Sequence, residues 1–281
     1  MKGYMGLFIN GVIFFIVAAG VLVSCTGEKG VTIQDFEGSG GALFKGVKLG
    51  TGSPPEIINE DASASSSYLQ LQSGKTFGES NGVGFDLSSR GVSNHIVADF
   101  DFRITCMGSR TGFSGGGCAD GFSFLLLDAS KHGNSGAPAV TQGETGALKN
   151  GAQFALGFNT FYNIGSPSDG GSGNSVSLLF NNKFIHGSAK PISFDLATGT
   201  QGKKGKFHHA HIDLLLGEKP NVSVKLTSGV TGKTIASYSK FDLSSVVEMK
   251  AAKWRVGFAS RCGDACSEVD IDNVNVSFSR E

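Results

Sequence analysis

The feature that most constrains the fold of this chain is the alternation of apolar and polar residues in short runs after residue 30. A period of two places successive side chains on opposite faces of a β-strand. The runs are bounded by Gly, Ser, Asn and Asp, which are typical of turns. The candidate strands lie at residues 31–38, 67–73, 95–106, 120–128, 153–161, 175–185, 209–216, 221–228, 234–241, 254–260 and 269–278.

Helical periodicity is nearly absent from the same region. One short helical turn is expected at residues 243–249, where Ser244 could act as the cap. Many short strands separated by turns predict an all-β sandwich or jelly roll of two antiparallel sheets. A sandwich of this kind often contains 200–250 residues, roughly the length that follows the N-terminal segment. We therefore expect a single domain at residues 31–281.

Composition limits the classes of partner. The chain has 24 Lys and Arg residues and 24 Asp and Glu residues, so its formal net charge is zero. Proteins that bind nucleic acid rely on an excess of basic residues, and this balance predicts no nucleic-acid partner. Glycine (42 residues) and phenylalanine (22 residues) are abundant, which suits strands joined by tight turns.

The first 25 residues have the pattern of a targeting segment. One lysine is followed by an apolar run that ends near Val23, as in a signal peptide. The run is also long enough for an uncleaved membrane anchor. Its end, LVSC at residues 22–25, resembles the bacterial lipobox, which implies lipidation of Cys25 and a polar tether at residues 26–30. We expect an exported lipoprotein of the cell envelope or outer surface, with secretion as the alternative.

The cysteines form two local pairs once Cys25 is set aside. Cys106 and Cys118 bracket a glycine-rich loop, and Cys262 and Cys266 bracket the sequence GDA. Local pairing is the simplest of the three possible connectivities, and export to an oxidising compartment favours disulfides. A metal site is the alternative, although the spacings do not match zinc-ribbon patterns.

The strand at residues 153–161 ends with an unusual mixture of side chains. Asn159 and Phe161 would share one face of the strand, and Asn163 follows just beyond it. An aromatic residue between two amides is poorly suited to a core. This pattern indicates either an edge that contacts sugar or the remains of a metal-binding loop.

Four stretches together resemble the legume-type (L-type) lectins. They are CADGFSFLLLD (118–128), FALGFNTFYN (154–163), FDLSSVVEMKAAKWRVGFASRCG (241–263) and VDIDNVNVSF (269–278), in the order found in that family. The resemblance implies the concanavalin A-like jelly-roll fold. It also implies a carbohydrate or glycoconjugate as the partner.

The resemblance also implies the residues of a sugar site. Asp120, which follows an alanine, would accept hydrogen bonds from sugar hydroxyls. Asn163 would donate a hydrogen bond, and the ring of Phe161 would cover the apolar side of a pyranose. A glycine amide in TQGETGA and the late CGDAC loop would complete the site. The predicted carbohydrate-binding residues are Asp120, Asn163, Phe161, Gly143, Asp264 and Ala265.

The chain departs from the family at its metal site. The family holds calcium and a transition metal partly through the Glu and Asp of an EFDTFYN-like strand, and these positions are Gly157 and Asn159 here. The expected histidine of the following strand falls near Ser175. Loss of these ligands predicts no transition metal, and calcium, which prefers oxygen ligands, is the possible cofactor. Its candidate ligands are Asn159, the Phe161 carbonyl, Asn163 and Asp169.

Two further clusters contain residue types that are found in metal sites or catalytic sites. His209 and His211 share one strand face, which suggests a metal pair or simply outward polar positions. Glu268, Asp270 and Asp272 also share a face, and glycosidases of related architecture use paired carboxylates for catalysis.

We expect a non-catalytic carbohydrate-binding protein in which the two disulfides position the sugar loops. The alternatives are a structural or adhesive surface protein with a decayed sugar site, and a glycan hydrolase or lyase on the same fold.

Overall fold

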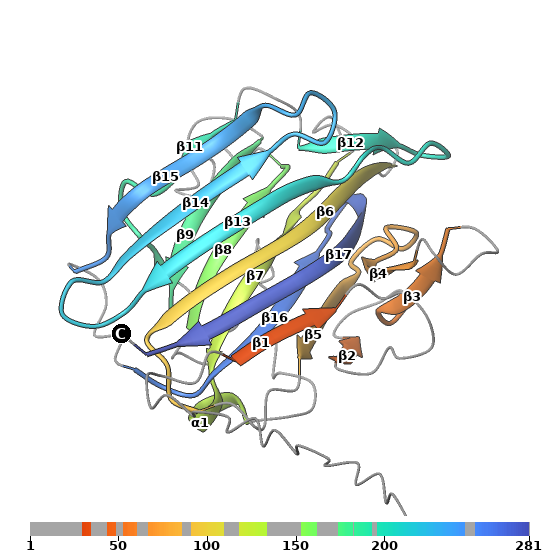
Figure 1. The fold of residues 1–281 in the computed structure, drawn as a ribbon. Coiled ribbons are helices and arrows are strands. Elements are labelled where there is room, and N and C mark those ends of the chain that lie inside the picture. The colour runs from red at the N-terminus through yellow and green to blue at the C-terminus, as the bar shows by residue number, and fades with distance from the viewer. Residues whose placement is uncertain are drawn as a thin grey trace, which may run out of the picture.

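The computed structural model describes residues 30–34, 44–48, 53–60, 67–85, 91–109, 118–133, 153–161, 174–181, 183–192, 196–244 and 251–280. In these residues the strands form two facing sheets (Figure 1). Strand pairing is antiparallel except between β12 and β6. The predicted two-sheet sandwich is therefore confirmed.

The larger sheet has nine strands in the described part of the chain. Its path runs β15 (Thr234–Asp242), β14 (Asn221–Thr227), β13 (His208–Leu215), β6 (His95–Ser109), β17 (Ala265–Ser279), β4 (Ser67–Gln72) and β3 (Glu56–Asn59), with β1 (Gly30–Gln34) on β17 and β12 (Ala197–Thr200) on β6.

The second sheet has eight strands within the same described ranges. Its path runs β10 (Lys183–Phe184), β9 (Ser175–Phe180), β8 (Gln153–Asn159), β7 (Gly121–Asp128), β16 (Trp254–Arg261), β5 (Ser80–Phe85) and β2 (Phe44–Lys48), with β11 (Lys190–Pro191) on β9.

Aromatic side chains fill the space between the sheets. Phe100 and Phe102 of β6 point inward and are fully buried. The Phe100 ring stacks on Phe124 of β7 at 5.6 Å, and the Phe102 ring lies 4.8 Å from that of Phe158 in β8. Phe258 of β16 meets Phe100 edge to face at 5.0 Å. Phenylalanine therefore supplies much of the contact between the sheets.

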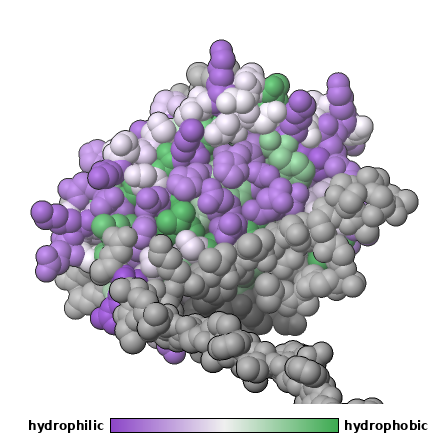
Figure 2. Space-filling view, viewed as in Figure 1, coloured by the Kyte–Doolittle hydropathy of each residue, from purple (hydrophilic) through white to green (hydrophobic). Residues whose placement is uncertain are grey.

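The outer face of the nine-stranded sheet is polar. Figure 2 shows a largely hydrophilic surface over β13, β14 and β15. His209 and His211 of β13 point outward, where their Nδ1 atoms contact Asp101 at 2.8 Å and Asp99 at 2.7 Å across the strand pair with β6. No group of three His, Cys, Asp or Glu side chains in the described residues is arranged to hold a metal ion. The histidines thus occupy ordinary outward positions.

The strand predictions failed where glycine, asparagine or proline interrupts the pattern. β5, with the sequence SNGVGF, was missed because its glycines and asparagine have low strand propensity, yet it is buried and pairs with β2 and β16. β2, β3, β11 and β12 were also missed. The predicted strand at residues 175–185 is instead a hairpin of β9 and β10, since Asn181 turns the chain with a φ of 48°.

The structure contains a short helix that the sequence did not predict. The helix in the described residues is α1 (Ala129–His132), which Asp128 caps by accepting a hydrogen bond from the amide of Ser130 at 2.8 Å. Residues 245–249 of the predicted helical turn lie outside the described residues, so the turn itself stays a prediction, and Ser244 hydrogen-bonds to Asp242. No helix in the described ranges is long and apolar enough to cross a membrane, and residues 1–25 lie outside those ranges.

Phe100→Ala should lower the free energy of unfolding by about 3–5 kcal/mol, because it leaves a cavity where four neighbouring rings meet. Urea denaturation of the purified chain measures this change. Val230→Ala is the control, since Val230 is 60 % exposed and its truncation should change stability by less than about 0.5 kcal/mol. Equal stability of the two variants would contradict the role of Phe100 in the core.

Candidate functional site

Three segments that the sequence placed in the sugar site meet at one end of the eight-stranded sheet. The start of β7 lies between the end of β8 and the end of β16, where Gly121 pairs with Asn159 on one side and with Arg261 on the other. The carbonyl of Asp120 accepts a hydrogen bond from the amide of Thr160 at 3.1 Å, and the amide of Asp120 donates to the Arg261 carbonyl at 3.0 Å. The backbone of Asp120 is therefore fixed on both sides.

Glycine at position 121 makes this close approach possible. Its φ is +135°, and a Cβ there would lie 1.9 Å from the carbonyl oxygen of Phe158. Any other residue would both strain the backbone and push the end of β8 away. Gly121 thus determines how closely Asp120 approaches the end of β8.

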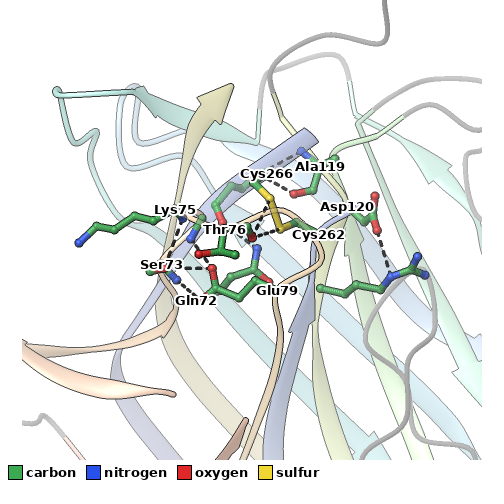
Figure 3. Close-up of a disulfide and its surroundings, with 12 residues drawn as sticks. Gln72, Ser73, Lys75, Thr76, Glu79, Ala119, Asp120, Cys262 and Cys266 are labelled. Carbon is green, nitrogen blue, oxygen red and sulfur yellow. Dashed lines mark hydrogen bonds and ion pairs between the residues drawn. A yellow bond between two sulfur atoms is a disulfide. The ribbon is translucent and has the colours of Figure 1, made fainter. Parts of the chain in front are cut away.

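The Asp120 carboxylate is mostly buried but remains accessible. Its side chain is 13 % exposed, and its Oδ2 lies 3.5 Å from Nε of Arg261 (Figure 3). A Cβ on Gly263 would lie 3.9 Å from both carboxylate oxygens, so the late hairpin passes directly beside the carboxylate. The peptide bond between Ala119 and Asp120 is cis. The arrangement leaves a carboxylate and a guanidinium beside each other at the end of the sheet.

Asn159 lies on the outer face of the sheet, as the alternation predicted, but β8 ends there, two residues before the predicted end, so the alternation does not extend to Phe161. Asn159 is buried, and its Oδ1 accepts a hydrogen bond from the amide of Phe161 at 3.1 Å. This bond makes a tight turn at the strand end and leaves Phe161 half-buried. Phe161 is therefore placed near Asp120, through Thr160.

The remaining predicted residues divide into two groups. Asp264 is exposed at the tip of the late hairpin, whereas Ala265 is buried, with only 1 % of the residue exposed. The second group lies outside the described residues and comprises Asn163, Gly143, Asp169 and Cys25.

Both predicted disulfides are present. Cys106 at the end of β6 is bonded to Cys118, two residues before Asp120. Cys262 and Cys266 are bonded across the late hairpin. Both pairings are local, and both flank the Asp120 segment. The alternative of a metal site at these cysteines is wrong.

Two residues of the site were missed by the sequence analysis. Arg261 beside Asp120 lies within the motif at residues 241–263 but was assigned no role there, and Glu79 beneath the late hairpin belongs to no motif. Glu79 is fully buried, and its carbonyl accepts a hydrogen bond from the amide of Cys262 at 2.8 Å. A lone charged residue near a strand end gives no sequence signal for such a contact.

The positions that correspond to transition-metal ligands carry neutral side chains. Gly157 of β8 pairs with Ser123 and Ser177, and Asn159 pairs with Ser175. Hydroxyl and amide groups are poor ligands for metals that prefer imidazole, thiolate or carboxylate. These residues do not fit a transition metal.

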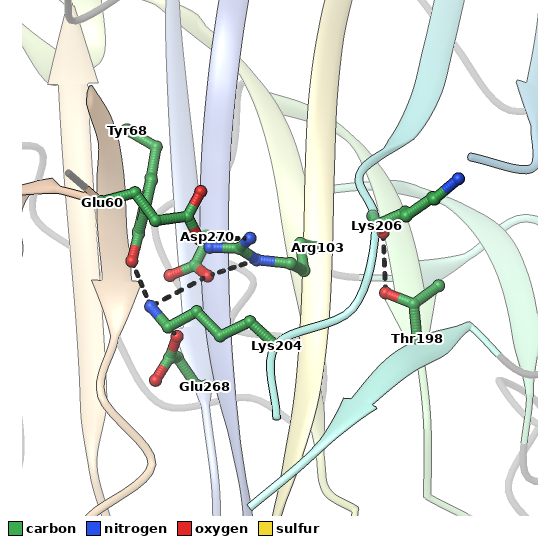
Figure 4. Close-up of polar contacts among 8 residues, drawn as sticks. All are labelled: Glu60, Tyr68, Arg103, Thr198, Lys204, Lys206, Glu268 and Asp270. Carbon is green, nitrogen blue, oxygen red and sulfur yellow. Dashed lines mark hydrogen bonds and ion pairs between the residues drawn. The ribbon is translucent and has the colours of Figure 1, made fainter. Parts of the chain in front are cut away.

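The carboxylates of β17 lie in a different place, on the outer face of the nine-stranded sheet. Asp270 is fully buried, and its Oδ2 accepts a hydrogen bond from Nε of Arg103 at 2.9 Å (Figure 4). Glu268 is 6 % exposed and forms an ion pair with Lys204 at 2.7 Å. Lys204 also donates a hydrogen bond to the hydroxyl of Tyr68. These contacts hold the segment after β12 against the sheet.

The charges of this cluster shift its protonation equilibria. Burial raises the pKa of the Asp270 carboxyl well above its ordinary value, and the neighbouring Glu268 charge adds to the rise. Burial would lower the pKa of Lys204, but Asp270 and the bonds to Glu268 and Tyr68 raise it overall. The carboxylates are enclosed by cations of the protein itself, which is unlike an acid pair open to a substrate.

Asp270→Asn should change the pH dependence of stability. Because folding raises the pKa of Asp270, the folded state binds the proton more tightly than the unfolded state. This contribution is complete below the ordinary carboxyl pKa and is lost as pH rises through the folded pKa. We expect the free energy of unfolding of the wild type to fall relative to that of the variant as pH rises above the ordinary carboxyl pKa, measured with urea. Parallel curves would contradict the shift.

Comparison with known proteins identifies the fold. No protein-family model matches the chain, and no curated protein matches its sequence. Among solved structures, winged bean acidic lectin has a TM-score of 0.60 at 16 % identity, and covers 90 % of this chain and 100 % of its own. Peanut lectin has a TM-score of 0.58 at 13 % identity, with 90 % and 99 % covered.

A third solved structure with this fold is a defense protein. Arcelin-5 from Phaseolus vulgaris, a lectin-like defense protein, has a TM-score of 0.54 at 16 % identity, with 91 % of this chain and 99 % of its own covered. At such low sequence identity the likeness concerns the fold. The chain has the jelly-roll fold of the legume lectins, as its sequence motifs predicted.

Proposed function

We propose that this protein binds carbohydrate without catalysis, at the end of the eight-stranded sheet where Asp120 lies. The observation that carries the proposal is the placement of a partly exposed carboxylate between the Phe161 segment and the exposed tip of the late hairpin. One structure with this fold supports it, since the winged bean acidic lectin is complexed with methyl-α-D-galactose.

The chemistry of the residues suits a saccharide. An ionised carboxylate accepts hydrogen bonds from two neighbouring hydroxyls, and charge-assisted bonds of this kind are comparatively strong. The Phe161 ring would pack against the apolar face of a pyranose. Asn163 and the amide of Gly143 would donate hydrogen bonds, and the exposed Asp264 would contact variable groups of the sugar. Arg261 adds a donor that the sequence analysis did not include.

Calcium is the metal that suits the oxygen atoms near this site. Asn159 and the Phe161 carbonyl would supply two ligands, and Asn163 and Asp169 two more. This proposed set contains one carboxylate, so any affinity for calcium would be low.

Export and anchoring are part of the same proposal. We expect cleavage before Cys25, lipidation of that residue, and display of the domain at the cell envelope. The two disulfides support an oxidising compartment. Many anchored copies would also raise the avidity of a weak single site for a glycan surface.

One observation favours a second function. The neutral residues at Gly157, Asn159 and Ser175 are also expected in a structural or adhesive surface protein whose sugar site has decayed. In that case the fold would persist and no glycan would bind. Glycan binding by the wild-type chain therefore separates the two functions, and release of sugar from polysaccharides would instead indicate a hydrolase or lyase.

Asp120→Ala should lower glycan affinity by about tenfold to a hundredfold, because it removes the acceptor of charge-assisted hydrogen bonds. A glycan array with the full chain identifies the ligand, and titration calorimetry compares the variants. Asp213→Ala is the matched control, since Asp213 is 46 % exposed on the outer face of the other sheet. Equal binding by both variants would place the site elsewhere.

Reduction of both disulfides should weaken glycan binding. Closing the four-residue separation of Cys262 and Cys266 contributes about 2 kcal/mol in the entropic description of a disulfide, which corresponds to more than tenfold in affinity if the loop is constrained for binding. The measurement is affinity before and after treatment with a reductant, with mass spectrometry to verify four free thiols. Unchanged affinity after complete reduction would remove the disulfides from this role.

A further inference from the structure

We propose that the Glu79 carboxylate, together with the Cys262–Cys266 disulfide, organises the Asp120 site in place of a transition metal. It does so by shaping the turn at residues 73–79, which braces the late hairpin. This role rests on the proposed function, because the site that Glu79 positions is the proposed saccharide site. Glu79 is a positioning residue that does not itself contact the ligand.

On the outer face near Asp120, the outward positions of β8 and β9 carry no charged side chain. Gly157 lies between Ser123 and Ser177, and all three positions are within the described sheet. Asn159 lies beside Ser175, and both are almost completely buried. No carboxylate, imidazole or thiolate occupies these four strand positions of β8 and β9, so a transition metal would find only weak ligands. The ends of these strands must therefore be fixed by other contacts.

The Glu79 carboxylate is surrounded by hydrogen-bond donors. Its side chain is fully buried, and its two oxygens accept hydrogen bonds at 2.9 Å from the amide of Ser73, the hydroxyl of Ser73 and the amide of Gly74. The side-chain amide of Asn81 donates a fourth bond at 3.3 Å. Every partner is a donor, so the site requires a side chain that only accepts. The carboxylate thereby determines the path of the turn.

The turn at residues 73–79 contacts the late hairpin directly. The Glu79 carbonyl accepts a hydrogen bond from the amide of Cys262 at 2.8 Å, and the amide of Gly78 donates to the Gly263 carbonyl at 3.2 Å. The carbonyl of Thr76 lies 3.5 Å from both sulfurs of the disulfide (Figure 3). The turn and the disulfide therefore both constrain the hairpin at residues 262–266.

The late hairpin is in turn hydrogen-bonded to the segment that carries Asp120. The amide of Asp120 donates to the carbonyl of Arg261, which immediately precedes the disulfide-bonded Cys262. Ser267, just after the hairpin, receives a hydrogen bond from the Ala119 amide and donates one to the Ala119 carbonyl, at 3.1 Å and 3.0 Å. Gly74 packs against Ser267 so closely that a Cβ would lie 2.6 Å from its carbonyl carbon. Direct contacts thus connect Glu79 with the segment that carries Asp120.

Glu79→Gln tests this connection, because it preserves size but turns an NH₂ group toward amide donors. We expect hydrogen exchange at the Asp120 amide to become faster by about tenfold or more, and glycan affinity to fall by a similar factor. Faster exchange at Ser73 and Gly74 with unchanged exchange at Asp120 would overturn the proposal.

Leu214→Ala is the control for general loss of stability. Leu214 is buried in β13 and pairs with Ile96, at the opposite end of β6 from Cys106. This variant should lower Tm at least as much as Glu79→Gln and leave glycan affinity within about twofold of the wild type. An equal loss of affinity in both variants would reduce Glu79 to a general stabilising role and overturn the proposal.

A metal titration tests whether the chain binds a transition metal. The full chain, stripped with EDTA, is titrated with Mn²⁺ and separately with Ca²⁺, and bound metal is counted by native mass spectrometry while Tm is recorded. We expect no stoichiometric Mn²⁺ and no rise in Tm with Mn²⁺, whereas a metal in large excess over its Kd would raise Tm by several degrees. One tightly bound Mn²⁺ per chain would overturn the inference.

The outcomes separate this inference from the proposed function. Exchange and metal binding are measured without sugar, so they decide the role of Glu79 even if no glycan binds the wild type. Absence of glycan binding would overturn the proposed function alone. Glycan binding that appears only after Mn²⁺ is added would overturn the inference and leave the function standing.

Discussion

The packing of aromatic side chains between the two sheets is the constraint on which the rest of the structure depends. Because side chains alternate along a strand, burying Phe158 between the sheets necessarily places Asn159 on the outer face. The same alternation buries Phe102 and turns Arg103 outward to Asp270. A slip by one residue in any of these strands would exchange the two faces. The position of the candidate site is therefore a consequence of the core.

The two buried carboxylates, Glu79 and Asp270, are stabilised in different ways that match their positions. Glu79 is surrounded by uncharged donors of a tight turn, so its charge organises backbone. Asp270 is bonded to Arg103 and lies 3.9 Å from Lys204, so its carboxyl group joins side chains from separate strands and a loop. Removing one partner of such a cluster costs far more than the cluster contributes. Both carboxylates thus restrict the structure to one arrangement.

The sequence was informative where burial and local chemistry acted together. Alternation predicted β6, β8 and β13, and four motifs in order predicted the fold. The cysteine spacing predicted both disulfides because each pair is close along the chain. β5 was missed since the glycines of SNGVGF conceal a buried strand. The contacts of Glu79 with Cys262 and of Asp120 with Arg261 join residues far apart in sequence, and no periodicity encodes such pairs.

The neutral residues at the described positions Gly157, Asn159, Ser175 and Ser177 change how a site of this shape can be built. Where a metal fixes a loop, part of the folding free energy comes from the ion, and the loop is ordered only when the ion is bound. Here the late hairpin is fixed by its own disulfide and by the hydrogen bonds of the turn that Glu79 shapes. These constraints exist as soon as the chain has folded. A ligand at Asp120 would then meet a preorganised site, and less of its binding free energy would be lost in ordering loops.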